Sequence, residues 1–141
     1  MKEAKRFLQE KDYFAKHAGI ELLVVEAGYA KARMEIRDFH LNAANIVHGG
    51  AIFTMADFVF AAAVNSHDQV AVGINASISY VKAATTGVLV AEAKELSLNR
   101  KLGNYTVEIR DEQNDLIAVF QGTAYRTTKK HQWAEGALPL P

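Results

Sequence analysis

Hydrophobic and polar residues alternate along much of the chain, most regularly in its second half. Between residues 70 and 80 every second residue is Val, Ile, Ala or Tyr, and the residues between them are small or polar. A period of two is the pattern of a β-strand with two different faces. Six segments carry this or a related pattern and are predicted to be strands: residues 20–26, 29–36, 70–80, 88–96, 105–110 and 116–125.

Two segments lack this alternation and are predicted to be helices. Residues 2–16 place Ala, Phe and Leu on one stripe among Lys and Glu, as an amphipathic helix does. Residues 49–66 are rich in Ala, Met and Phe with aromatics on more than one face, so this helix is expected to be enclosed.

The order of these elements predicts an α+β fold, with an antiparallel sheet of about five to six strands curled around one long central helix. A sheet covers only one side of a helix, so a partner is expected on the other side. We divide the chain into an N-terminal helix (residues 1–18), one main domain (19–127) and a poorly ordered C-terminal tail (128–141).

Composition excludes several classes of protein. The 141 residues are half hydrophobic, and 16 Lys and Arg balance 16 Asp and Glu, which is unlike a disordered chain or a nucleic-acid binder that works by bulk charge. The absence of cysteine excludes disulfides, thiolate nucleophiles and Cys-ligated metals. The five histidines show no spacing typical of a metal site, so no metal is expected.

The most apolar segment, residues 49–64, is shorter than the roughly 20 residues that span a bilayer, and Asp57 lies in its middle. The N-terminus lacks a secretory apolar segment. We therefore expect no membrane association and a cytoplasmic location.

Candidate chemistry gathers around the long helix. Gly49 and Gly50 could serve only to let the chain turn into the helix. They could also expose the first N–H groups, which carry the positive end of the helix dipole, to the carbonyl oxygen of a ligand. Such N–H groups would stabilise an oxyanion.

Asp57 is the most informative residue, because an apolar helix rarely carries a carboxylate for packing alone. It could be a structural aspartate tied to backbone donors. It could instead be a general base or nucleophile whose pKa is raised by its apolar surroundings.

The spacing of these two features constrains the site. Eight residues of helix separate Gly49 from Asp57, which is roughly 12 Å along the axis. One carbonyl group cannot contact both unless the helix is broken or the two groups come from different chains. Two antiparallel copies of the helix across a two-fold axis would form two equivalent sites, which predicts an obligate dimer.

Three further residues have open roles. His48 precedes the helix and could be a base, a ligand contact or a structural residue. Asn42 in the preceding loop and Asn75 in a strand could each bind a carbonyl group or a water, although loop asparagines commonly form turns.

The pattern Asn42-x5-His48-Gly49-Gly50-x6-Asp57 resembles the signature of hotdog-fold acyl-CoA thioesterases, in particular the phenylacetate-pathway (PaaI-type) branch. The resemblance covers roughly residues 19–126. It implies side-by-side dimers, commonly paired into tetramers, with Asp57 as base or nucleophile and the Gly49 N–H polarising the thioester carbonyl. It also implies that Asn42 and His48 assist, and that Asn75 stands where some relatives have Ser or Thr.

The chain departs from this family pattern at two places. Many relatives have Gly where this chain has Asn45, and many have Pro near Ala83. Coenzyme A is polyanionic and the chain is neutral, so its phosphates need a local basic patch. The candidates lie at strand ends or turns, where they could equally be ordinary surface charges: Lys82, Arg100, Lys101 and Arg126.

The leading hypothesis is a thioesterase that hydrolyses an acyl- or aryl-CoA to the free acid and CoA without a metal or added cofactor. Two alternatives stay open. One is a hydratase or dehydratase of acyl thioesters that uses His48 as base, and the other is a non-catalytic acyl-CoA-binding module.

Overall fold

The computed structural model describes residues 1–133. Its elements follow in this order: α1 (Lys2–Lys11), α2 (Tyr13–His17), β1 (Ile20–Glu26), β2 (Tyr29–Glu35), the 3-10 helix η1 (Asp38–His40), α3 (Gly49–Val64), β3 (Gln69–Tyr80), β4 (Val88–Leu98), β5 (Leu102–Arg110) and β6 (Leu116–Lys130). The predicted strands and the long helix are all present.

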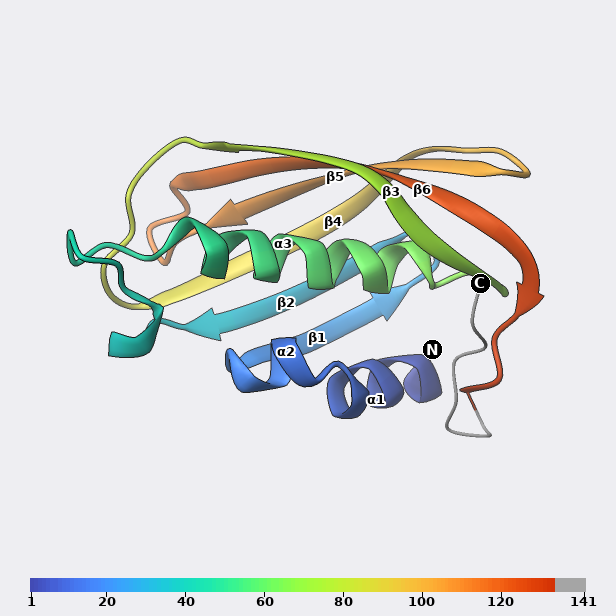
Figure 1. Ribbon diagram of the computed structural model, residues 1–141, viewed down its shortest axis with the longest axis horizontal. Helices are drawn as coiled ribbons and strands as arrows, with labels where there is room; N and C mark the ends of the chain where they lie inside the picture. The colour runs from blue at the N-terminus through green and yellow to red at the C-terminus, as the bar shows by residue number, and fades with distance from the viewer. Residues whose placement is uncertain (134–141) are drawn as a thin grey trace.

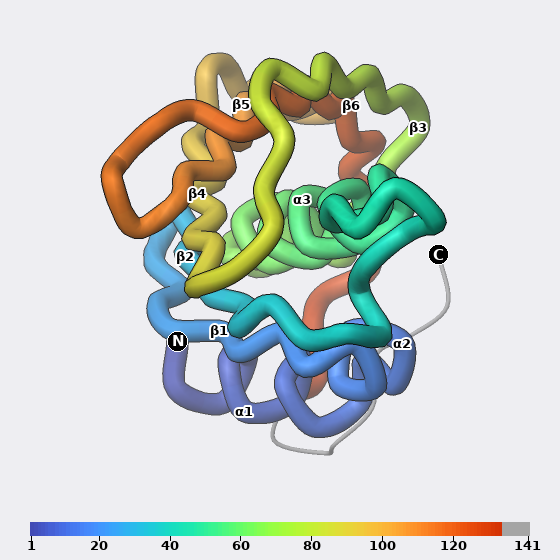
Figure 2. Tube along the Cα trace, turned by 90° about the vertical axis from the view of Figure 1, so that its left-hand side faces the viewer, coloured from blue at the N-terminus to red at the C-terminus, as the bar shows by residue number. Residues whose placement is uncertain are grey.

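The strands form one antiparallel sheet in the order β1-β2-β4-β5-β6-β3. The sheet curves around α3, which contacts every strand, while α1 and α2 lie beside β1 (Figures 1 and 2). This is the hotdog architecture that the sequence pattern predicted. It leaves two edge strands, β1 and β3.

Helix α3 fills the concave side of the sheet. Phe60 packs against Tyr105 and Phe120, with ring centroids 5.7 and 5.4 Å apart. A Cβ at Gly122 would lie 2.7 Å from the Phe60 ring, so the sheet needs a glycine there. The residues of α3 that stay wholly or partly uncovered include one stripe at helical spacing, formed by Gly50, Thr54, Asp57 and Ala61.

The N-terminal helix is not continuous, contrary to the prediction for residues 2–16. Asp12 leaves the helical conformation (φ −82°, ψ 86°), ends α1 and caps α2 by accepting a hydrogen bond from the Ala15 N–H at 3.1 Å. An aspartate cap satisfies a backbone donor that a continuing helix would have used otherwise, which explains the break.

The predicted tail also begins too early. Strand β6 continues to Lys130, which pairs with Gln69 of β3, so residues 128–130 belong to the sheet. Residues 134–141 of the predicted tail lie outside the described residues. Within residues 1–133, no helix has the length and apolar character needed to cross a membrane.

Candidate active site

The loop before α3 positions its first turn. His48 is the N-cap of α3, and its Nδ1 accepts a hydrogen bond from the Gly50 N–H at 2.8 Å. The backbone N–H of His48 donates to the His40 carbonyl at 2.7 Å. A neutral imidazole that accepts at Nδ1 carries its proton on Nε2. His48 therefore caps the helix, and in this arrangement its Nδ1 lone pair is occupied by the Gly50 N–H.

The N–H group of Gly49 has no acceptor among the described residues. The neighbouring donors are all used, because Gly50 bonds to the His48 side chain and the N–H groups of Ala51 and Ile52 donate to the His48 carbonyl at 3.0 and 3.2 Å. Of the two glycines in the sequence pattern, Gly49 is thus the one that offers an unpaired donor at the positive end of α3.

Tyr80 also contacts the start of α3, and the sequence analysis did not identify it as a candidate site residue. It ends β3, and its hydroxyl donates to the Gly49 carbonyl at 3.1 Å. A Cβ on Gly49 would lie 3.1 Å from the tip of the Tyr80 ring. No local sequence signal links two residues 31 positions apart, because the contact depends on how β3 runs back along α3.

Asn42 holds the loop rather than pointing a free carbonyl oxygen at a ligand. Its side-chain oxygen accepts from the N–H groups of Ala44 at 2.9 Å and Ile46 at 3.4 Å, which is an Asx turn. Asn45 adopts a positive φ of 59°. Asparagine tolerates this left-handed conformation better than most residues, so Asn45 holds a conformation that glycine would also allow.

Asp57 lies midway along the uncovered stripe of α3. Its carboxylate makes no hydrogen bond or ion pair with any residue in the described part of the chain, which argues against the purely structural interpretation. It lines a hollow of about 310 Å³ with Asp12, Phe14, Phe53 and Phe58 among its neighbours.

The surroundings of Asp57 raise its pKa above the ordinary carboxyl value. The largest cause is the loss of hydration against the apolar walls, and the second is repulsion by the nearby carboxylate of Asp12. The group remains open to solvent on one side. An unpaired carboxylate with a raised pKa, still accessible to water, is suited to accept a proton.

Helix α3 runs unbroken from Gly49 to Val64. The eight-residue spacing therefore keeps Gly49 and Asp57 roughly 12 Å apart along the axis within one chain. Asn75 is also remote from Gly49 in the same chain, because it lies five strand residues, roughly 17 Å, from Tyr80. It is exposed on β3 opposite Thr123 of β6, beside an irregularity in the strand pairing. One chain does not assemble the predicted constellation by itself.

The four predicted phosphate-binding residues separate into two groups. Lys82 follows β3 and forms ion pairs with Asp115 at 2.5 Å and Asp111 at 3.6 Å across the β5–β6 turn. The other three lie near the β4–β5 turn, at the far end of the sheet. Arg126 donates from its side chain to the Asn99 carbonyl at 2.7 Å, and its backbone N–H donates to the Lys101 carbonyl, also at 2.7 Å.

Arg100 and Lys101 themselves are exposed, and neither side chain forms an ion pair within residues 1–133. Arg100 and Lys101 are therefore available to an anion, whereas the Arg126 guanidinium is bonded to Asn99 and Gln69 and Lys82 has two carboxylate partners.

Comparisons with known proteins agree with this fold. The family model described as the thioesterase superfamily matches residues 44–118, which include Gly49, Asp57 and Asn75. A candidate esterase of Archaeoglobus fulgidus is 42% identical over 130 residues, covering 92% of this chain and 84% of that protein. The acyl-coenzyme A thioesterase PaaI of Escherichia coli is 32% identical over 120 residues, covering 84% of this chain and 86% of that enzyme.

The solved structure of the E. coli PaaI protein superposes on this chain with a TM-score of 0.85 at 30% identity, over 91% of this chain and 96% of that one. The chain therefore belongs to the thioesterase superfamily. Its PaaI relatives support the hotdog-fold, PaaI-type branch within it, as the sequence resemblance predicted.

Proposed function

We propose that the protein is a metal-independent acyl-CoA thioesterase of the cytoplasm whose active site forms between two copies of the chain. The observation that carries this proposal is the arrangement of α3. One end of the helix offers the unpaired Gly49 N–H, and its uncovered stripe carries the unpaired Asp57 carboxylate with a raised pKa.

The chemistry follows from these two groups. The Gly49 N–H of one chain donates to the thioester carbonyl oxygen, where negative charge develops as the carbonyl carbon is attacked. Asp57 of the other chain either takes a proton from the attacking water or attacks the carbon itself and forms an anhydride that water then opens. In both routes the C–S bond breaks, the CoA thiolate leaves and takes up a proton, and the acyl group becomes a free acid.

The free edge of β3 supports the dimer. This strand of twelve residues contains no charged residue and no proline, and Ile74 and Tyr80 on it are 57% and 53% exposed. Natural proteins normally protect such an edge, because its unpaired backbone groups invite another strand. We propose that β3 pairs with β3 of a second copy, and that such dimers can pair further into tetramers.

The opposite edge strand of the sheet, β1, is protected by helix α1. Gln9 of α1 donates to the Ile20 carbonyl at 3.0 Å and accepts from the Leu22 N–H at 2.5 Å, so α1 covers the edge of β1. Only β3 is left for a second strand within the described sheet. Antiparallel pairing there places the start of one β3 beside the end of the other.

Antiparallel pairing of the two β3 strands also brings the basic residues of one chain toward the candidate site of the other. Arg126 lies beside the start of β3, opposite Ala71, whereas Gly49 and Tyr80 lie at its end. In the dimer, the basic group of Arg100, Lys101 and Arg126 from one chain approaches the Gly49 end of its partner. We propose that this group binds CoA phosphates there.

The experiment that tests the proposal is a thiol-release assay over short, medium, long and aromatic acyl-CoAs. Release of CoA thiol with formation of the free acid supports it, and absence of release from the whole panel contradicts it. A single turnover in ¹⁸O-water tests the direct route, because water that opens the anhydride at the Asp57 carboxyl carbon leaves label in Asp57, whereas a general base leaves label only in the product acid.

We expect Asp12→Asn to move the acidic limb of the pH–rate profile to lower pH. Asp12 raises the pKa of Asp57 by repulsion, so removing that charge lets Asp57 lose its proton, and become active, in more acidic solution. Asparagine is as good an N-cap as aspartate, so α2 should persist.

The matched control for this prediction is Glu10→Gln on α1, a carboxylate of the same N-terminal region that is ion-paired with Arg6. It should leave the limb where it is. An unmoved limb in Asp12→Asn, or an equal movement in both variants, contradicts the prediction.

A further inference from the structure

A second hollow, of about 490 Å³, lies against the first two turns of α3. This volume falls in the range of about 300–1,000 Å³ typical of small-molecule sites. Its walls come from α2 with the residue after it, from η1, and from α3: Phe14, His17, Ala18, Phe39, His40, Gly50, Ala51 and Thr54.

Two aromatic side chains dominate this hollow. Phe14 is 72% exposed and Phe39 is 68% exposed, so each presents most of its surface to water. They come from segments 25 residues apart in the sequence, yet both line the same hollow. Large exposed apolar groups that converge in this way mark a site for an apolar ligand.

The hollow continues toward the candidate catalytic residue. It shares Phe14 and Thr54 with the smaller hollow that contains Asp57. An apolar surface therefore extends along the uncovered side of α3 from Gly50 to Asp57. In the proposed dimer, its two ends border the Gly49 donor of one site and the Asp57 carboxylate of the other.

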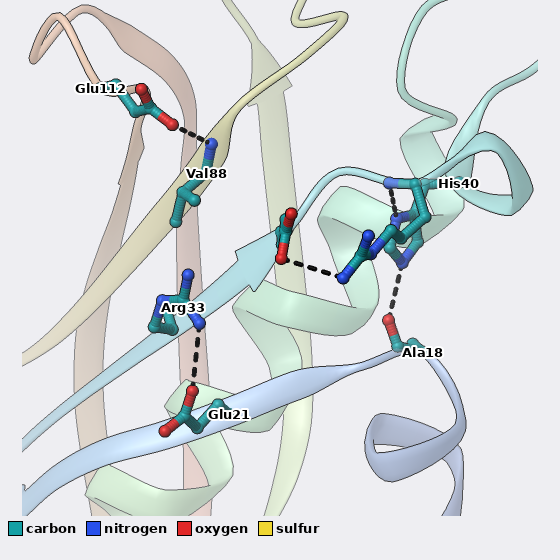
Figure 3. Close-up of polar contacts among 8 residues, drawn as sticks. Ala18, Glu21, Arg33, His40, Val88 and Glu112 are labelled. Atoms are coloured by element: carbon teal, nitrogen blue, oxygen red, sulfur yellow. Dashed lines mark hydrogen bonds and ion pairs between the residues drawn. The ribbon is translucent and has the colours of Figure 1, made fainter.

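His40 holds the two walls together. Its Nδ1 accepts from the Arg37 N–H at 2.9 Å, and its Nε2–H donates to the Ala18 carbonyl at 2.6 Å (Figure 3). The side chain is 3% exposed. It thus links the start of η1 to the end of α2, the two segments that carry Phe39 and Phe14.

We propose that this hollow binds the acyl part of the substrate and that Phe14 and Phe39 determine which acyl groups are accepted. The inference rests on the proposed thioesterase function. The acyl part is the portion of an acyl-CoA that fits, because the phosphates require cations and His17 is the only titratable side chain of the hollow besides the buried, hydrogen-bonded His40. The space favours a bulky aliphatic or aromatic acyl group over acetyl.

The test compares kcat/KM for acetyl-CoA and for a medium-chain and an arylacetyl-CoA. In Phe14→Ala and Phe39→Ala, the value for the two bulky substrates should fall about tenfold or more relative to the value for acetyl-CoA in the same variant. Tyr13→Ala is the matched control, because Tyr13 is 68% exposed, lies on the same helix next to Phe14, and does not line the hollow. It should change neither value.

Several outcomes overturn the inference. An equal loss for all three substrates, or no loss for the bulky ones, shows that these rings do not select the acyl group. Phe14→Leu and Phe39→Leu guard against misfolding, since they keep the apolar contact and should retain most of the preference.

A binding measurement separates this inference from the proposed function. Calorimetric titration of the Asp57→Asn protein with the same three acyl-CoAs needs no turnover. Affinity that rises with the bulk of the acyl group, and loses that rise when Phe14 and Phe39 are also replaced by Ala, supports the hollow even if no thiol is released. Affinity that ignores the acyl group contradicts it even if hydrolysis occurs.

Discussion

Asp57→Asn should lower kcat for thioester hydrolysis by about 10²–10⁴-fold, the range that positioned acid–base groups contribute. Asparagine has nearly the shape of aspartate but cannot accept the proton of water or form an anhydride. Since the carboxylate has no structural partner among the described residues, its loss should not disturb the fold, and KM should change far less than kcat.

The same variant should be more stable than the original protein at neutral pH. Burial and Asp12 raise the pKa of Asp57 in the folded state, so the folded protein holds this proton more tightly than the unfolded chain does. The charged carboxylate therefore costs stability once the pH is above its ordinary value of 3.8. Because the group is partly open to water, the gain from removing it should be small, up to about 1 kcal/mol.

Thermal melts of both proteins across a range of pH check this sign. The stability difference should be present at neutral pH and should vanish in acid, below the ordinary carboxyl pKa, where Asp57 is protonated in both states. Asp68→Asn, at an exposed aspartate beyond the end of α3, is the control and should affect neither activity nor this difference. An Asp57→Asn protein with normal turnover, or one less stable at neutral pH, contradicts the prediction.

Local pattern was sufficient to predict most of the fold. The alternation over residues 70–80 is a local property of the sequence, and it predicted a strand there. The structure has β3 at Gln69–Tyr80, which confirms the prediction. One error fell where a single side chain overrides the pattern. Asp12 divides a helix whose apolar stripe continues past it, because its carboxylate caps the second part.

The candidate site was predictable only in part. Asp57 was identifiable because a carboxylate on an apolar helix is unusual, and the Gly–Gly pair marked the start of that helix. The sequence could not show which of Gly49 and Gly50 keeps an unpaired N–H. That depends on the orientation of the His48 ring, which accepts the hydrogen bond from Gly50. Tyr80 and the aromatic pair Phe14 and Phe39 reach the site through tertiary contacts that leave no local trace in the sequence.

Gly49→Pro should lower kcat at least about 10²-fold relative to Gly49→Ala, the effect typical of losing one oxyanion donor. Proline removes only the N–H that the mechanism uses, and it is well tolerated at the first position of a helix. His48 already has φ −59° and ψ 135°, a conformation that a residue before proline prefers. Alanine carries the same Cβ toward Tyr80 but keeps the N–H, so the comparison isolates the donor.

Mixing the two inactive chains then tests whether the site is shared. If each site combines Gly49 of one chain with Asp57 of the other, a hybrid of Gly49→Pro and Asp57→Asn has one intact site and one site that lacks both groups. Random assembly from equal amounts makes half the dimers hybrids, so co-refolding should restore about a quarter of the original activity. Recovery no greater than the sum of the two inactive proteins would show that the two groups do not meet across an interface. That result would contradict the shared site, because the unbroken α3 prevents one chain from bringing its own Gly49 and Asp57 to a single carbonyl.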